Sequence, residues 1–184
     1  MMKQLAARLS NSLHLPLKDA LFLGFCAVFA VLVRMLLRLH LHVSGHAMIT
    51  KIFFLMLGRG STSCRYGASF TGLLAGTAAM FLGFAKVGPF IIVKYVLAGL
   101  VIDLAALLLP GLFGSYLLCA LVAAAAASTK FFTVYAINRM IGMDHVVNLQ
   151  RSLLEAGGAI IFGVAAGLMI PMVVRRLRAY GVVR

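Results

Sequence analysis

Five ionisable side chains interrupt the apolar runs of this sequence and are the first candidates for chemistry. They are Lys51, Lys94, Asp103, Lys130 and Glu155, each with mainly apolar neighbours along the chain. An ionised group is costly in an apolar surrounding, so such residues either pair with one another or take part in function. Buried cations beside a carboxylate are suited to holding a polar or anionic small molecule.

Motifs of catalysis are absent from the sequence. There is no HExxH, no Walker A motif, no GxSxG and no paired acidic motif that would hold Mg²⁺. The whole chain has 4 acidic residues, which leaves little for acid–base catalysis. We therefore expect no enzyme, no catalytic residue and no cofactor, and the chain by itself has no nucleotide motif with which to power transport.

The elements that must position these side chains are membrane helices. Of the 184 residues, 63% are hydrophobic and 11% charged, and the mean hydropathy is +1.06. Soluble domains are about half apolar and about a quarter charged. The apolar residues form long runs broken by Gly and Pro, whereas the strands of a membrane barrel would alternate in polarity. At about 25–30 residues for a span and its loop, the length accommodates roughly six helices.

We expect an all-α integral membrane protein that forms one transmembrane domain over residues 1–184. Residues 1–17 are expected to be an amphipathic lead-in and residues 175–184 a basic tail. The second helix is short for a membrane span, and residues 138–152 are expected to form the longest polar connection. The six expected helices are 18–38, 47–57, 66–84, 90–110, 115–137 and 153–174.

The charge is strongly unbalanced, with 17 Lys and Arg against 4 acids and a net charge of +13. Most cations lie at the ends of apolar runs, which indicates topology and headgroup attraction rather than nucleic-acid binding. With both termini cytoplasmic, nine flanking cations lie inside and four outside, which favours N-in and C-in. The inside set is Lys3, Arg8, Lys18, Arg59, Arg65, Arg175, Arg176, Arg178 and Arg184, and the outside set is Arg38, Lys86, Arg139 and Arg151.

That orientation places several polar side chains at one depth in the outer half of the bilayer. We expect a solute-capture pocket there, with the loop from His40 to His46 as its lid. The alternative is a structural Lys–Glu pair or lysines that extend toward the interface. The expected substrate-binding residues are Lys94, Tyr95, Lys130, Tyr135, Asn138, Glu155, His42 and His46.

Two other features are assigned to structure. Asp103 lies deeper than Lys94 and on the opposite helical face, where we expect it to pair with a cation of the second or the first helix, such as Arg34, or to stabilise an interface on the cytoplasmic side. The spacing of His40, His42 and His46 could suit a transition metal, but no carboxylate or thiolate completes the set. We therefore expect no metal site.

Small residues recur at four-residue spacing in several helices, and such stripes let helix backbones approach closely. We expect most stripes to pack internally, as with Ala68–Gly72–Gly76, Ala159–Gly163–Gly167 and Ala120–Ala124–Ser128. The first helix has a free side to offer, so Ala20, Gly24 and Ala27 are expected to contact a partner subunit.

Several segments together resemble the substrate-binding S-component of energy-coupling factor (ECF) transporters, a class of ABC importers. They are the loop 39–45 leading into Gly45-His46-Ala47-Met48, GASFTGLLAG at 67–76, GPF at 88–90 and YVLAGLVID at 95–103. The resemblance implies a six-helix bundle in the cell (inner) membrane that binds a vitamin or related micronutrient near the outer face. It also implies a transmembrane T-component and two cytoplasmic ATPase subunits as partners.

The resemblance has two departures and leaves three alternatives open. The family's Ala-x3-Ala docking motif is replaced by Ala20-x3-Gly24, and the chain begins Met-Met rather than the Met-His of nickel- and cobalt-specific members. The alternatives are such a metal-specific S-component, a small envelope scaffold similar to the rod-shape proteins, and an enzyme acting on lipid. A scaffold would bury the three charged residues Lys94, Lys130 and Glu155 against protein, and an enzyme would need a metal site or a nucleophile–base pair.

The orientation can be tested by cysteine labelling. In a chain whose three natural cysteines are replaced, a cysteine at Val43, Val87 or Val147 should react with a membrane-impermeant reagent added outside intact cells. A cysteine at Lys18 is the inside control and should react only after the membrane is opened. Labelling of any of the first three only from the cytoplasm would contradict the orientation.

Overall fold

The computed structural model describes residues 17–40, 47–62, 64–83, 88–109 and 111–181, and all regular structure among them is helical. Among these residues, four helices are long and apolar enough to cross a membrane: α2 (Leu17–His40), α5 (Phe90–Leu108), α6 (Tyr116–Met140) and α7 (His145–Ala179). The all-α prediction is confirmed, and these four helices fit a membrane protein. The elements are α2 (Leu17–His40), α3 (Ala47–Ser61), α4 (Gly67–Phe81), α5 (Phe90–Leu108), the 3₁₀ turn η1 (Leu112–Gly114), α6 (Tyr116–Met140) and α7 (His145–Ala179).

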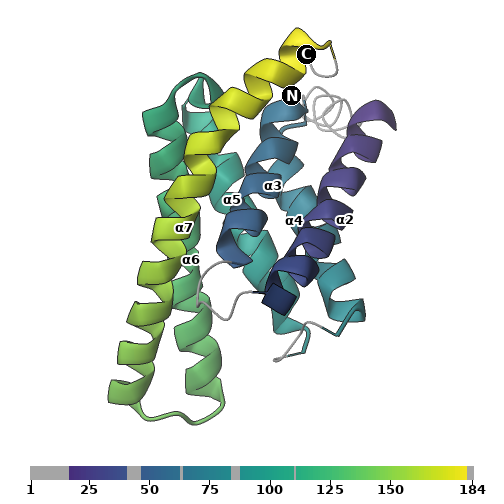
Figure 1. Ribbon diagram of the computed structural model, residues 1–184. Helices are drawn as coiled ribbons and strands as arrows, with labels where there is room; N and C mark the ends of the chain where they lie inside the picture. Colours follow the sequence, from purple (N-terminus) through teal and green to yellow (C-terminus); the bar gives the residue numbers. More distant parts are fainter. Residues whose placement is uncertain (1–16, 41–46, 63, 84–87, 110, 182–184) are drawn as a thin grey trace, which may run out of the picture.

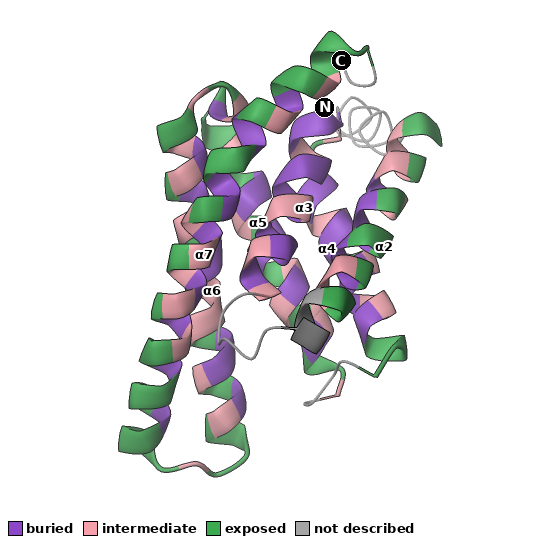
Figure 2. Cartoon of the chain, viewed as in Figure 1, coloured by how far each residue is buried: buried purple, intermediate pink, exposed green. Residues whose placement is uncertain are grey.

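Successive α-helices run in opposite directions, so the start of α2 and the end of α7 lie at the same end of the bundle (Figure 1). α3 lies in the middle and packs against α2, α4, α5 and α7. Ten of its 15 residues are buried, and purple dominates its ribbon in Figure 2. The short second helix ends at Ser61 rather than at Leu57, and it is the most enclosed helix of the bundle.

The last two helices depart most from the sequence expectation. The prediction of a polar connection over residues 138–152 is wrong, because α6 continues to Met140 and α7 already begins at His145. Asp144 caps α7 by accepting a hydrogen bond from the Val146 amide at 3.3 Å. The two helices form a hairpin that projects beyond the other helices (Figure 1).

α7 is one continuous helix of 35 residues with Pro171 inside it. At 1.5 Å per residue it is about 52 Å long, well beyond the roughly 30 Å of bilayer hydrocarbon. Near its far end, the Arg175 guanidinium donates to the Gly114 carbonyl at 2.9 Å and lies 5.5 Å from the centre of the Tyr116 ring. These contacts join the end of α7 to the turn between α5 and α6.

Glycines allow the closest helix contacts. A Cβ on Gly99 of α5 would lie 2.7 Å from the Ala68 carbonyl oxygen and 2.8 Å from the Ser69 Cα of α4. A Cβ on Gly72 of α4 would lie 2.8 Å from the Tyr95 carbonyl oxygen of α5. The α4 stripe therefore packs internally, as expected.

The same holds between α6 and α7. A Cβ on Gly167 would lie 2.7 Å from the Cys119 carbonyl oxygen, and one on Gly163 would lie 3.3 Å from that of Ala123. On α6, however, the small residues that meet these two glycines are Cys119, Ala123 and Ala127. The stripe expected at Ala120, Ala124 and Ser128 is one residue out of phase with the contact.

Asp103 of α5 is 2% exposed and binds the start of α4. Its carboxylate accepts hydrogen bonds from the amides of Ala68 at 3.1 Å and Ser69 at 2.7 Å, and from the Ser69 hydroxyl at 2.6 Å. Arg59 Nε of α3 lies 3.4 Å from the same carboxylate. The expected structural role fits, and the cation comes from the second helix, one of the two helices expected to supply it, in the form of Arg59. Arg34, the named example from the first helix, is not the partner, because Asp103 lies at the other end of the bundle.

Replacing Gly99 with Ala should destabilise the protein by about 1–3 kcal/mol, because the new methyl group meets backbone atoms that only a helix shift can move. The matched control is Gly24→Ala, where no atom lies within 4 Å of the new Cβ. Thermal unfolding in detergent should show a lower Tm for Gly99→Ala only. Equal Tm values for both variants would contradict the close α4–α5 contact.

Candidate functional site

A polar cavity of about 180 Å³ lies where α3 and α5 begin and where α2 approaches its end. Side chains from α2, α3, α5, α6 and α7 form its wall. Four cations and one carboxylate are among the lining residues, which are Arg34, Ala47, Met48, Lys51, Ile91, Lys94, Tyr95, Lys130, Thr133, Val134 and Glu155. Charge concentrated in a cavity of an otherwise apolar helical protein marks a candidate binding site.

Tyr95 organises the α2 and α3 side of the cavity. The Arg34 guanidinium donates to the Tyr95 hydroxyl at 2.7 Å and lies 5.8 Å from the ring centre. The Lys51 ammonium lies 5.0 Å from the same ring centre and donates to the Lys94 carbonyl oxygen at 2.6 Å. Tyr95 is 2% exposed, so its ring holds two cations in place.

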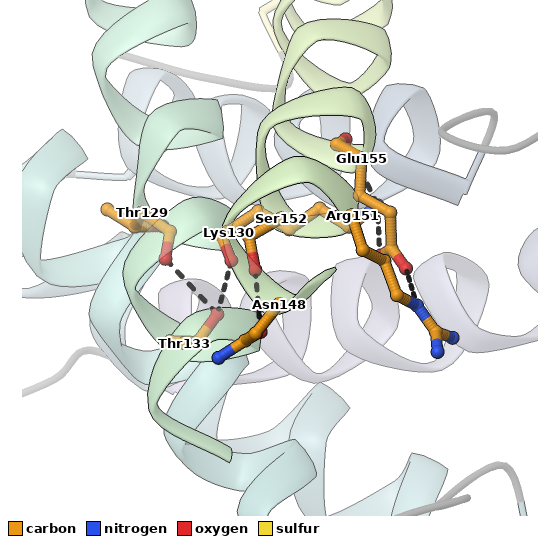
Figure 3. Close-up of polar contacts among 7 residues, drawn as sticks. All are labelled: Thr129, Lys130, Thr133, Asn148, Arg151, Ser152 and Glu155. Atoms are coloured by element: carbon orange, nitrogen blue, oxygen red, sulfur yellow. Dashed lines mark hydrogen bonds and ion pairs between the residues drawn. The ribbon is translucent and has the colours of Figure 1, made fainter. Parts of the chain in front are cut away.

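Lys130 and Glu155 form the α6 and α7 side. The Lys130 ammonium lies 3.3 Å from a Glu155 carboxylate oxygen and 3.3 Å from the Glu155 carbonyl oxygen. The other carboxylate oxygen of Glu155 lies 3.4 Å from Nε of Arg151, one helical turn earlier (Figure 3). Thr133 donates its hydroxyl to the backbone of α6, to the carbonyls of Thr129 and Lys130. Glu155 is therefore the counter-ion of this side.

The structure brings four of the expected substrate-binding residues together, since Lys94, Tyr95, Lys130 and Glu155 all line the cavity. Two others lie farther along the hairpin. The Tyr135 ring stacks on Phe131 with centroids 6.0 Å apart, and the Asn138 side chain binds Asn148. His42 and His46 lie outside the residues that the structure describes.

Lys51 and Arg34 are cavity residues that the sequence interpretation did not include. Lys51 was recognised only as an ionisable residue in an apolar run, and Arg34 only as a candidate partner of Asp103. Lys51 is 8% exposed, which makes it the most enclosed of the four cations. The sequence feature that indicates a cavity role for Lys51 is its position in the first turns of a short helix, beside a long apolar run.

A buried polar network holds the α6–α7 hairpin together. The Asn148 amide donates to the Tyr135 carbonyl at 3.0 Å, and its oxygen accepts from Asn138 at 3.1 Å and from the Ser152 hydroxyl at 3.2 Å. Asn148 and Ser152 are fully buried, and Figure 3 shows their contact between two turns of α7. Asn138 thus has a structural role here rather than a place in the cavity.

The expected partner-binding residues divide into two kinds. Ala27 is 2% exposed and belongs to the internal cluster with Ala75 and Ala79 of α4, so it offers no free surface. Ala20 and Gly24 are partly exposed, and the space beyond Gly24 is open. The expected contact surface is thereby reduced to these two positions.

The described residues contain no group of three His, Cys, Asp or Glu side chains that could hold a metal ion. The fold and the cavity define a helical membrane protein with a cationic polar pocket. In comparisons with known proteins, the chain matches no family model, no curated protein and no solved structure.

Replacing Asn148 with Ala should destabilise the hairpin by about 0.6–1.7 kcal/mol, the range for hydrogen bonds between membrane helices. The amide of Asn138 and the hydroxyl of Ser152 both lose a buried acceptor. Gln150→Ala, at an exposed position in the same turn of α7, is the control. Hydrogen exchange at the α6–α7 tip should increase in Asn148→Ala alone, and unchanged exchange would contradict this role.

Proposed function

We propose that this chain is the substrate-capture subunit of an ECF-type importer and binds a vitamin or related micronutrient. The observation that supports the proposal is the cavity, in which residues from five helices place four cations and one carboxylate around one space. Lys94 and Lys130 are 36 positions apart in the sequence, yet both line it. A site of this kind selects a polar solute and needs no catalytic group.

The arrangement of the helices supports a six-segment bundle with both ends cytoplasmic. The helices alternate in direction, and the start of α2 and the end of α7 share one end (Figure 1). α3 and α4 have 15 residues each, about 22 Å of helix, which is short for a span. We propose that both cross the membrane as tilted or enclosed segments, and that the cavity then lies toward the outer face of the cell (inner) membrane.

Transport would require partners, since the sequence has no nucleotide motif. The proposed partners are a transmembrane T-component and two cytoplasmic ATPase subunits. Ala20 and Gly24 of α2 are the proposed contact, because the space beyond Gly24 is open and the large side chains Leu21, Phe25 and Val28 beside the small pair are exposed.

One observation favours a second candidate, a small envelope scaffold of the rod-shape type. Lys130 and Glu155 form an ion pair, and a scaffold needs such pairs only for structure. The two functions differ in what Lys130 does: a capture subunit uses it to hold substrate, whereas a scaffold uses it only to join α6 to α7.

Lys130→Met should weaken ligand binding about tenfold to a hundredfold, because a charge-assisted contact contributes roughly 1.5–3 kcal/mol. The measurement is isothermal titration of the purified full chain against a panel of vitamins. Arg139→Met is the matched control, since it removes a cation from an exposed position of the same helix.

Native mass spectrometry of the full chain, extracted from its own membranes, provides the second readout. A capture subunit should retain a small molecule and associate with ATP-binding subunits. A chain that carries neither, and whose Lys130→Met variant behaves as wild type, is the scaffold rather than the transporter subunit.

A further inference from the structure

The charges around the cavity are not balanced. Arg34, Lys51, Lys94 and Lys130 line it, and Glu155 is the one carboxylate among its described lining residues. The chain has three other acidic residues, and all three lie elsewhere. Asp19 is in the first turn of α2, Asp103 of α5 binds the start of α4, and Asp144 is at the hairpin turn. Among the described residues, no second carboxylate therefore serves as a counter-ion in the cavity.

Three of the four cations contact no carboxylate. Arg34 binds the Tyr95 hydroxyl, and Lys51 binds the Lys94 backbone carbonyl. The Lys94 ammonium forms no hydrogen bond or salt bridge with another described residue, and the Glu155 carboxylate attracts it only at longer range. Cations enclosed without an anion carry a desolvation cost that neutral acceptors only partly offset.

We propose that the ligand of this cavity is a compact organic anion that carries a carboxylate or a phosphate. The inference rests on the proposed function and specifies its substrate class. The anionic group is held by Lys51 and Lys94 of α3 and α5, and Arg34 is kept in place behind them by Tyr95. A bound anion supplies the charge that the chain itself lacks.

The size of the cavity limits the ligand further. The cavity has a volume of about 180 Å³. That is below the roughly 300–1,000 Å³ of sites for drug-sized molecules. A single ring or short chain with one or two acidic groups fits this space.

The direction in which neutralising Glu155 changes the binding affinity tests the proposal. Its carboxylate lies 3.3 Å from the Lys130 ammonium, so it occupies the place that a ligand anion would take on that lysine. An anionic ligand is repelled by Glu155, and a cationic ligand is attracted by it. Neutralising Glu155 must therefore tighten the binding of anions and weaken the binding of cations.

The probes are chosen to differ in charge at nearly constant size. Nicotinate and nicotinamide differ by a carboxylate against an amide, succinate and inorganic phosphate carry no ring, and choline is a compact cation. Each is titrated calorimetrically into the full chain in lipid nanodiscs. We expect binding of at least one of the three anions and none of nicotinamide or choline.

The variants are paired with controls of equal charge change. Lys94→Met and Lys51→Met should each weaken anion binding at least tenfold, whereas Lys18→Met, at an exposed site on α2, should leave it unchanged. Glu155→Gln should tighten anion binding about tenfold. Asp144→Asn is its control, because it removes one negative charge near α7 and keeps a side chain that can cap the helix.

Each outcome decides the proposal. If Lys51→Met fails to fold, Lys94→Met and Glu155→Gln still carry the test. Binding of choline or nicotinamide that Glu155→Gln weakens overturns the anion inference and leaves the capture function standing. Failure of every anion also overturns it, and the capture function is then decided by the molecules that co-purify. If the chain binds anions but assembles with no ATPase, the inference about the ligand is supported and the proposed importer function is overturned.

Discussion

One buried carboxylate fixes the positions of three helices. Asp103 of α5 binds two amides at the start of α4 and pairs with Arg59 of α3, in a bundle whose other contacts are mainly apolar and without direction. Those amides have no partner within their own helix, so the carboxylate satisfies them from outside. Because α5 is continuous, the same contact sets the height of Lys94 and Tyr95, about 13 Å farther along.

The helical class and part of the candidate site could be predicted because each depends only on a short stretch of the sequence. Long apolar runs specify membrane helices wherever they occur, and an ionisable residue inside such a run is costly wherever it lies. This reasoning predicts Lys94, Lys130 and Glu155, and the shared depth adds Tyr95; all four line the cavity. Alternating helices place them at one depth, which is a consequence of simple up-and-down topology.

What escaped prediction depends on how helices fit together. The polar residues Asn148 and Ser152 indicated a connection, but they are buried between α6 and α7 and extend the hairpin instead. In the alanine run 123–127 several faces look equivalent, and only contact with α7 selects Ala123 and Ala127. The partners of Arg34 and Asp103 were likewise set by which helix ends meet, a property that no single segment contains.

The length of α7 has a mechanical consequence. Glu155 at the cavity and Arg175 at the η1 turn are 20 residues apart on one helix, which separates them by about 30 Å. A rod of that length acts as a lever, so a tilt of a few degrees at one end displaces the other by ~2 Å. Pro171 donates no hydrogen bond to the Gly167 carbonyl, which leaves the rod one weak joint just before Arg175. Since Pro171 is the one proline inside α7, the helix is uninterrupted from Glu155 to this joint, and the place where it bends most easily lies in its last turns.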